Sequence, residues 1–153
     1  IDFGHAGALK SLLGKESAVF QAKALDALGR KDLDALATLE QTVPEIAVFK
    51  DAYGELDTVM HRSESVAFLQ KACAEITEVK RGLKADQVSW YCDLGETHGF
   101  NYHTGLVFGI YSLKGDQLLV RGGRYDHVGE SFGRARAATG FSADLKTLVR
   151  LAN

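Results

Sequence analysis

The glycines of this chain divide it into two parts that must fold differently. Six of the 16 glycines lie in residues 1–82, whereas ten lie between Gly95 and Gly140. Glycine interrupts helices and permits the tight turns that join strands. The first part is therefore predicted to be mainly helical, and the second to consist of strands joined by turns. Helices followed by an antiparallel sheet make the predicted fold class α+β.

Helical start and stop signals recur through the first part. The sequence predicts a short helix over residues 6–13, ended by Gly14, and a second over residues 16–28, ended by Gly29. Asp32 suits the cap of a third helix, because its side chain can accept a hydrogen bond from the free N–H groups of the first turn. The apolar positions of this third helix are Leu33, Leu36 and Leu39.

The longest helix is predicted over residues 63–82. Pro44 opens a shorter one before it, since the N–H that proline lacks has no partner in a first turn. In residues 63–82 apolar side chains recur every three or four positions, as on the buried face of an amphipathic helix. Packing into a core explains this stripe without a functional role. The stripe consists of Val66, Leu69, Cys73, Ile76 and Val79.

The second part has the two-residue period of strands. Residues 87–94 alternate between apolar and polar, which predicts a half-buried strand. Residues 105–113 are almost continuously apolar, which predicts a strand covered on both faces. Residues 117–121 form a third predicted strand. The three-residue connection 114–116 between the last two indicates an antiparallel hairpin.

After the hairpin the pattern becomes irregular. We predict a bend at the Gly122-Gly123 pair and an irregular stretch to about Thr139. Ser142 or Asp144 then opens a last helix. The residues of this helix predicted to face inward are Leu145, Leu148 and Val149.

The charge of the chain bears on its partners. A formal net charge of −2 argues against a surface built mainly for nucleic acid or membranes. Residues 121–153 carry 6 basic and 3 acidic side chains, and this local excess either receives an anion or forms a solvated face. No apolar run is long enough for a membrane span.

The two cysteines indicate the cellular compartment of the protein, and the first residue indicates whether the sequence is a piece of a longer one. Cys73 and Cys92 form no CxxC pair, which suits a reducing cytoplasm and predicts two buried thiols. The chain begins at Ile1, and its one methionine is Met60. We therefore expect a piece of a longer, cytoplasmic protein.

Common cofactor and catalytic motifs are absent from the sequence. It has no phosphate-binding loop, no dinucleotide-binding glycine motif and no nucleophile elbow, so no cofactor is predicted. His98 and His103 could ligate a metal together with Cys92. On a regular strand, however, side chains five residues apart face opposite sides, so no metal site is predicted.

Tyr102, Arg124 and Tyr125 lie beside glycines near the ends of predicted strands. A tyrosine there can line a pocket with an apolar ring and a polar tip, and a Gly-Gly pair lets a ligand come close. From the residues alone, a ligand pocket and a packed hairpin end remain equally good interpretations.

Three stretches of the second part resemble histidyl-tRNA synthetase and its non-catalytic relatives in order and spacing. The resemblance is strong over residues 86–151 and weaker over residues 2–7 and the helices after them. It implies the C-terminal part of a class II aminoacyl-tRNA synthetase-like catalytic domain, an antiparallel sheet with flanking helices and a helical insert. The stretches are GFNYHTGLVF at 99–108, RGGRYD at 121–126 and ATGFSADL at 138–145.

The resemblance also implies how the chain is organised. Residues 1–85 correspond to a mainly helical, insert-like segment, and residues 86–153 to the antiparallel sheet and the helix of class II motif 3. Both are implied to be parts of one truncated domain. Motif 1, the usual dimer element of the family, and motif 2 are not in the sequence, so self-association is expected through a missing N-terminal part.

Departures from the synthetase pattern bear on the implied activity. His98 stands where the synthetase has the arginine that stabilises charge as the amino-acid carboxylate attacks ATP. Thr147 stands where motif 3 has the arginine that clamps ATP, while Asn101 and His103 replace an aspartate and a tyrosine. Neither histidine nor threonine supplies the cationic fork of arginine. The resemblance thus implies that adenylation is lost and that no catalytic residue remains.

A synthetase-like chain with these losses and no anticodon-binding domain resembles the regulatory subunits of ATP phosphoribosyltransferase. That family activates a short catalytic subunit and transmits feedback inhibition by histidine in the first step of histidine biosynthesis. The resemblance implies a protein partner and histidine as an effector. The residues that match the histidine-pocket motifs are Tyr102, His103, Gly122, Gly123, Arg124 and Tyr125.

Two other functions stay open. A histidyl-tRNA synthetase whose pattern has drifted would activate histidine with ATP. A stand-alone tRNA- or amino-acid-binding module would use the basic residues of the second part, although the net charge argues against nucleic acid. These residues are Arg121, Arg134, Arg136, Lys146 and Arg150.

Overall fold

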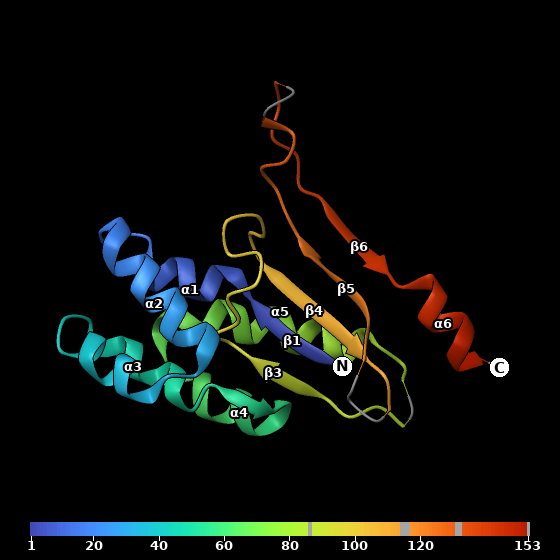
Figure 1. The fold of residues 1–153 in the computed structure, drawn as a ribbon, viewed down its shortest axis with the longest axis horizontal. Coiled ribbons are helices and arrows are strands. Elements are labelled where there is room, and N and C mark those ends of the chain that lie inside the picture. The colour runs from blue at the N-terminus through green and yellow to red at the C-terminus, as the bar shows by residue number, and fades with distance from the viewer. Residues whose placement is uncertain (86, 114–116, 131–132, 153) are drawn as a thin grey trace.

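The computed structural model describes residues 1–85, 87–113, 117–130 and 133–152, which form one sheet flanked by helices (Figure 1). The strands are β1 Asp2–His5, β2 Tyr53–Glu55, β3 Tyr91–Asp93, β4 Leu106–Tyr111, β5 Leu118–Arg124 and β6 Thr139–Ala143. The α-helices are α1 Ala6–Leu13, α2 Ala18–Arg30, α3 Leu33–Glu40, α4 Leu56–Ser63, α5 Gln70–Gly82 and α6 Leu145–Ala152. Two 3-10 helices are η1 Pro44–Lys50 and η2 Ala67–Leu69.

The strand order in the described part of the chain is β2-β3-β1-β4-β5-β6. β1 runs parallel to β3, and the other described pairs are antiparallel. The predicted α+β class is confirmed, but the sheet is mixed rather than purely antiparallel. The sequence does not predict β1, β2 or β6. Strands as short as β1 and β2 have no room to display a two-residue period.

The predicted starts of several helices are confirmed. α1 covers Ala6–Leu13, as predicted, and the carboxylate of Asp32 caps α3 by accepting a hydrogen bond from the N–H of Ala35 at 3.0 Å. Pro44 opens the 3-10 helix η1. These local signals depend on one or two residues each, so they survive whatever the rest of the fold does.

The end of α2 differs from the prediction. Gly29 lies inside the helix, which continues to Arg30 and closes at Lys31 in the left-handed conformation, with φ 53°. The N–H of Lys31 donates to the carbonyl of Leu28 at 3.1 Å, so a lysine closes this helix where glycine is usual. A Cβ at Gly29 would lie 3.1 Å from Oγ1 of Thr97. Glycine therefore lets the segment between β3 and β4 approach α2.

The single helix predicted over residues 63–82 starts too early, because a turn and the 3-10 helix η2 separate α4 from α5. α4 ends at Ser63 and α5 begins at Gln70. The carbonyl of the buried Ser63 accepts a hydrogen bond from the N–H of Val66 at 3.0 Å, which turns the chain. Val79 is 39% exposed, and the buried members of the predicted stripe are Leu69, Cys73 and Ile76.

The hydrophobic core lies between the helices and the sheet. Phe3 of β1 stacks on Trp90 with ring centroids 5.8 Å apart. Both cysteines are free and buried, as predicted, and burial raises the pKa of each thiol. None of the described helices is both long and apolar enough to cross a membrane. The largest fully buried side chains include Phe49, Leu9, Leu13, Leu28, Leu36, Ile46 and Ile76.

β4 and β5 form the predicted antiparallel hairpin, and its connection 114–116 lies outside the described residues. The prediction that β4 is covered on both faces is wrong. Val107 is buried, but Tyr111 is 43% exposed. β4 contacts α1 and α5, while residues of its other face line a cavity.

The bend predicted at the Gly122-Gly123 pair is wrong, because β5 runs through both glycines. Gly122 pairs with Phe108 of β4 and with Phe141 of β6, so it lies in the middle of three hydrogen-bonded strands. The prediction of an irregular stretch to about Thr139, with a helix opening at Ser142 or Asp144, misses β6. Phe141 is the one large apolar residue of this strand, and the small residues around it give no clear two-residue period.

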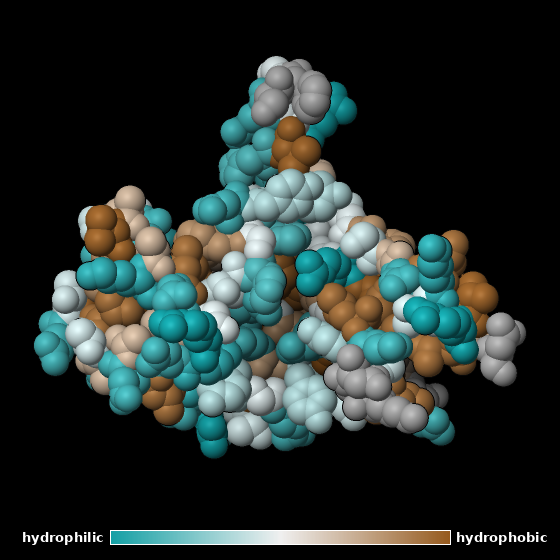
Figure 2. Space-filling view, in the orientation of Figure 1, coloured by the Kyte–Doolittle hydropathy of each residue, from teal (hydrophilic) through white to brown (hydrophobic). Residues whose placement is uncertain are grey.

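Asp144 opens α6, since its carboxylate accepts a hydrogen bond from the N–H of Thr147 at 3.1 Å. The prediction that Leu145 and Val149 face inward is wrong, because they are 71% and 53% exposed, whereas Leu148 is half-buried. Figure 2 shows hydrophobic side chains gathered over the right-hand end of the molecule, where α6 lies in Figure 1. Among the described residues of α6, Leu145 and Leu151 are thus largely exposed.

Candidate functional site

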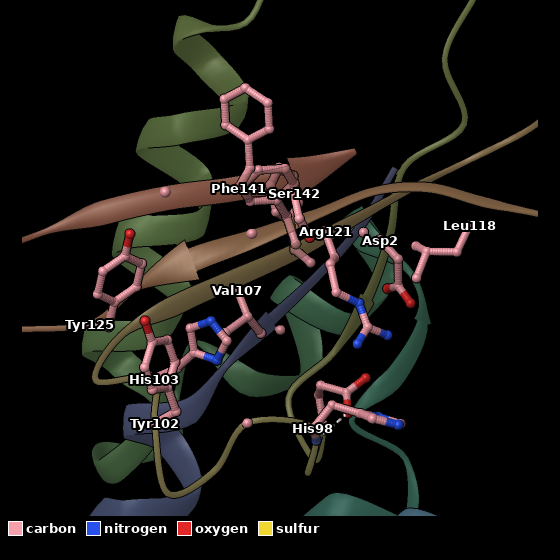
Figure 3. A pocket seen from close by; sticks show the side chains of 18 of the residues that line it. Asp2, His98, Tyr102, His103, Val107, Leu118, Arg121, Tyr125, Phe141 and Ser142 are labelled. Carbon is pink, nitrogen blue, oxygen red and sulfur yellow. Dashed lines mark hydrogen bonds and ion pairs between the residues drawn. The ribbon is translucent and has the colours of Figure 1, made fainter. Parts of the chain in front are cut away.

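A cavity of about 470 Å³ opens over one face of the sheet (Figure 3). Residues that pair directly across antiparallel strands share a face. Asp2 of β1 pairs with Gly109 of β4, and Gly109 pairs with Arg121 of β5. Arg121 in turn pairs with Ser142 of β6. All four line the cavity, so its floor is the sheet itself.

Glycines create part of the space in this cavity. A Cβ at Gly123 would lie 2.7 Å from Cδ2 of His103, and a Cβ at Gly140 would meet the hydroxyl of Tyr125. Larger residues at these two positions would displace the aromatic side chains. Of the three residues for which the sequence leaves a pocket and a packed hairpin end open, Tyr102 and Tyr125 line this cavity and Arg124 does not.

Three aromatic rings form one end of the cavity. The rings of Tyr102 and Tyr125 lie 5.0 Å apart, and the imidazole of His103 meets Tyr102 edge-on at 5.2 Å. Burial lowers the pKa of His103, and the positive charges of Lys10 and Arg121 lower it further. The imidazole is therefore neutral at pH 7. Tyr102 is 51% exposed, so this end is open to a ligand.

The segment between β3 and β4 positions two of these rings. Gly99 adopts φ 72°, a left-handed conformation that favours glycine, and its carbonyl accepts hydrogen bonds from the N–H groups of Tyr102 and His103 at 2.9 and 2.8 Å. The ammonium group of Lys10 in α1 donates to the carbonyl of His103 at 2.7 Å. The turn at Gly99 and the helix α1 thus hold the backbone of Tyr102 and His103 in place.

Acidic and basic groups line the other end of the cavity. Burial raises the pKa of Asp2 to about 6, and the nearby carboxylates of Asp93 and Glu96 add to the rise. Burial also acts to raise the pKa of Glu96, but hydrogen bonds from the N–H and the imidazole of His98, at 2.6 and 2.7 Å, hold it below its ordinary value. Arg121 supplies a positive charge from β5.

The raised pKa of Asp2 predicts a pH-dependent stability. The folded state holds this proton more tightly than the unfolded state, so ionisation of Asp2 costs stability as pH rises from about 4 through about 6. We expect Asp2→Asn to stabilise the protein by on the order of 1 kcal/mol at pH 7, after allowance for partial exposure, and to have little effect at pH 4. Urea unfolding of both proteins at these two pH values measures this. Equal stabilities at pH 7 would contradict the prediction.

Arg124 lies outside the cavity. Its guanidinium Nε donates to both carboxylate oxygens of Asp126, at 2.9 and 3.1 Å, and the hydroxyl of Thr104 donates to the same carboxylate at 3.0 Å. The N–H of Ala138 also donates to Asp126, at 3.3 Å. Burial acts to raise the pKa of Asp126, but these hydrogen bonds lower it below its ordinary value. The carboxylate of Asp126 thus links Arg124, at the end of β5, to the segments before β4 and β6.

The six residues predicted to bind histidine are therefore divided between two places. Gly123 and Arg124 line a hollow beside α5, although the missing Cβ of Gly123 makes room for the ring of His103. The four that line the cavity are Tyr102, His103, Gly122 and Tyr125.

Both positions that resemble lost synthetase arginines have local roles. His98 hydrogen-bonds Glu96 at the mouth of the cavity, and its side chain is 79% exposed. Thr147 is buried and does not line the cavity: its hydroxyl donates to Asp144 at 2.9 Å and accepts from the guanidinium of Arg150 at 2.9 Å. Hydrogen bonds from Thr147 hold the pKa of Asp144 below its ordinary value.

The reason that the sequence gives against a metal site does not hold. His98 and His103 lie in the irregular segment between β3 and β4, not on a strand, and both line the cavity. Cys92 is buried in the core instead. Over the described ranges, no three His, Cys, Asp or Glu side chains form a group that could hold a metal ion.

Sequence reasoning missed Asp2, Glu96 and the orientation of Arg121 in the cavity. Asp2 and Glu96 lie far apart in the chain and meet only because β1 inserts between β3 and β4. Arg121 had a usable signal, since it begins the RGGRYD stretch. A strand continued through Gly122 and Gly123 would have placed it two positions from Gly123, on the same face.

Comparison with known proteins gives the relationship. The family model described as histidyl-tRNA synthetase matches residues 1–148. A curated relative from Stutzerimonas stutzeri, named ATP phosphoribosyltransferase regulatory subunit, is 39% identical over 164 residues, covering 99% of this chain and 42% of that protein. A protein of the same name from Bordetella avium is 33% identical, and the match covers 97% of this chain and 42% of that protein. The chain thus spans less than half the length of these relatives.

Solved structures share the fold. A protein from Bacillus halodurans, titled ATP phosphoribosyltransferase regulatory subunit/histidyl-tRNA synthetase, matches 99% of this chain and 43% of its own with a TM-score of 0.71 and 23% identity. A chain of an ATP phosphoribosyl transferase complex from Thermotoga maritima matches with a TM-score of 0.66 and 18% identity, covering 94% of this chain and 52% of its own. Histidyl-tRNA synthetase from Nostoc sp. matches with a TM-score of 0.70 and 20% identity, covering 98% of this chain and 41% of its own. Since the family model matches nearly the whole sequence, the chain belongs to the histidyl-tRNA synthetase family.

Proposed function

We propose that this chain is part of a regulatory subunit of ATP phosphoribosyltransferase, a cytoplasmic protein that performs no chemistry itself. It activates a short catalytic subunit and carries histidine feedback to it. The names of relatives at 33–39% identity support this role, as does the fold shared with a chain of the Thermotoga maritima complex. Self-association in this proposal depends on parts of the protein beyond this chain.

The observation that carries the proposal is a pocket kept without the synthetase's arginines. The cavity and its aromatic end are present, while His98 and Thr147 occupy the two positions that resemble the catalytic arginines. Adenylation develops negative charge that fixed cations must stabilise, and removing one such group typically costs ~3–4 kcal/mol of transition-state stabilisation. Thr147 is also held in a helix cap, so it cannot be redirected to ATP.

Histidine suits this cavity. The volume of the cavity lies in the range of about 300–1,000 Å³ that is common for small-ligand sites. Tyr102 and Tyr125 offer apolar faces with hydroxyl tips to an imidazole, and His103 offers a neutral ring that can donate or accept a hydrogen bond. Binding here would place an effector between β4, β5, β6 and the segment that follows β3.

Mixing the full-length protein with a short-form ATP phosphoribosyltransferase catalytic subunit tests the proposal. We expect ATP phosphoribosyltransferase activity to rise on mixing and to fall again when histidine is added. The proposal also predicts no histidine-dependent exchange between ATP and pyrophosphate by the full-length protein alone. An unchanged rate on mixing would refute the regulatory role.

Histidyl-tRNA synthetase activity is the second candidate, because the family model and the Nostoc structure both carry that name. It requires that other residues replace the two arginines in charge stabilisation. Vigorous ATP–pyrophosphate exchange with histidine, together with no effect on the catalytic subunit, would favour this candidate over the first.

A further inference from the structure

Arg121 is a cation in the cavity without an ionic partner among the described residues. It lines the cavity from the middle of β5, and within the described ranges the remaining lining residues include neither lysine nor another arginine. Two carboxylates, Asp2 and Glu96, line the same cavity, yet the ion pairs within the described residues do not include one from Arg121 to either. An arginine that is left unpaired beside carboxylates is available to an anionic group of a ligand.

Arg121 offers the cavity a guanidinium, whereas position 98 offers it an imidazole. His98 stands on the segment between β3 and β4, at one side of the cavity mouth, and is occupied by its hydrogen bonds to Glu96. Figure 3 shows the guanidinium of Arg121 directed into the space between Asp2, His98 and Val107. A planar guanidinium there can bind a carboxylate through two parallel N–H groups, a geometry that an imidazole does not offer.

The carboxylates beside Arg121 indicate what kind of anion fits. Asp2 and Glu96 would repel a phosphate or another group of high negative charge. They would attract an ammonium group of a ligand. The guanidinium of Arg121 lies beside the carboxylates of Asp2 and Glu96. These groups match the carboxylate and the ammonium group, respectively, of one α-amino acid. The aromatic end then receives its side chain.

We infer that Arg121 anchors the α-carboxylate of the amino acid that occupies this cavity, with Asp2 and Glu96 holding its α-ammonium group. The inference rests on the proposed function for the identity of the amino acid, histidine, but the role of Arg121 is separable from regulation. The inference places the carboxylate anchor on β5, 23 positions after His98, which occupies the position that resembles the synthetase arginine.

The test compares histidine with histamine, which has the same imidazole and ammonium groups but no carboxylate. We expect the full-length protein to bind histidine about 50-fold more tightly than histamine in isothermal titration calorimetry, since one charge-assisted, two-bond contact contributes about that factor. Arg121→Gln should lose about 50-fold in histidine affinity and change histamine affinity less than about twofold. Arg121→Lys should recover only part of the loss.

A matched control and a separate readout keep the outcomes distinct. Arg62→Gln removes an exposed arginine on α4, outside the cavity, and should leave both affinities unchanged. Equal losses for histidine and histamine in Arg121→Gln, no loss for either, or no histidine binding by the wild-type protein would each overturn the inference. Activation of the catalytic subunit on mixing is measured in parallel. If activation is normal but Arg121→Gln keeps its histidine affinity, the inference fails while the regulatory function stands.

Discussion

Leu36→Ala should lower the free energy of unfolding by about 3 kcal/mol, whereas Leu33→Ala, one turn earlier in the same helix, should change it by less than about 0.5 kcal/mol. Both residues lie in α3 and lose the same atoms. Leu36 is 1% exposed and belongs to the core cluster, so its truncation loses buried surface and leaves a cavity. Leu33 is 53% exposed, so little buried surface is lost there.

Urea unfolding of the full-length protein, followed by circular dichroism, measures both changes. The pair is informative because the sequence gives Leu33 and Leu36 the same apolar pattern and cannot rank them. Both variants keep a residue with high helix propensity, so changes in intrinsic helix stability largely cancel. Losses of similar size in the two variants would mean that α3 packs on a different face from the one described.

The helices could be predicted from the sequence because their signals are local. Asp32 caps α3 and Pro44 opens η1, and each effect depends on side chains within one turn. The end of α2 escaped prediction because it depends on a distant contact. A Cβ at Gly29 would crowd the hydroxyl of Thr97, and the residue that usually ends a helix lies inside one here.

Strands β1 and β6 could not be predicted, because their pairing partners in the sheet define them. β1 pairs with β3 and β4, whose partner residues lie about 90 and more than 100 residues later in the sequence. β6 shows no two-residue period, and its pairing with β5 is what makes it a strand. Pairing of this kind follows tertiary context more than intrinsic preference.

The candidate site was predictable only in its aromatic part. Tyr102 and Tyr125 lie within three residues of a glycine in family-like stretches, so a resemblance could find them. Arg121 required the knowledge that β5 continues through two glycines, because a bend there removes any regular alternation. The outward position of Arg124 follows from the same strand, since alternate residues face opposite sides.

Gly122→Ala should destabilise the protein by about 2–3 kcal/mol and weaken ligand binding in the cavity. A Cβ at Gly122 would lie 2.5 Å from the carbonyl oxygen of Gly140 and 2.7 Å from Cζ of Phe108. The ring of Phe108 can turn aside, but the carbonyl of Gly140 belongs to the backbone of β6. That edge strand must therefore shift, and it carries Ser142, which lines the cavity.

Gly82→Ala is the matched control for Gly122→Ala, because the same methyl group is added where there is room for it. A Cβ at Gly82, the last residue of α5, would meet nothing within 4 Å. Alanine is favoured over glycine in helices by up to about 1 kcal/mol, so this variant should be as stable as the wild type or slightly more so. Urea unfolding and histidine titration of both variants check the contrast. If Gly122→Ala unfolds at the wild-type urea concentration and binds histidine normally, β5 and β6 are not packed as tightly as the structure describes, and β6 is then not a rigid wall of the cavity.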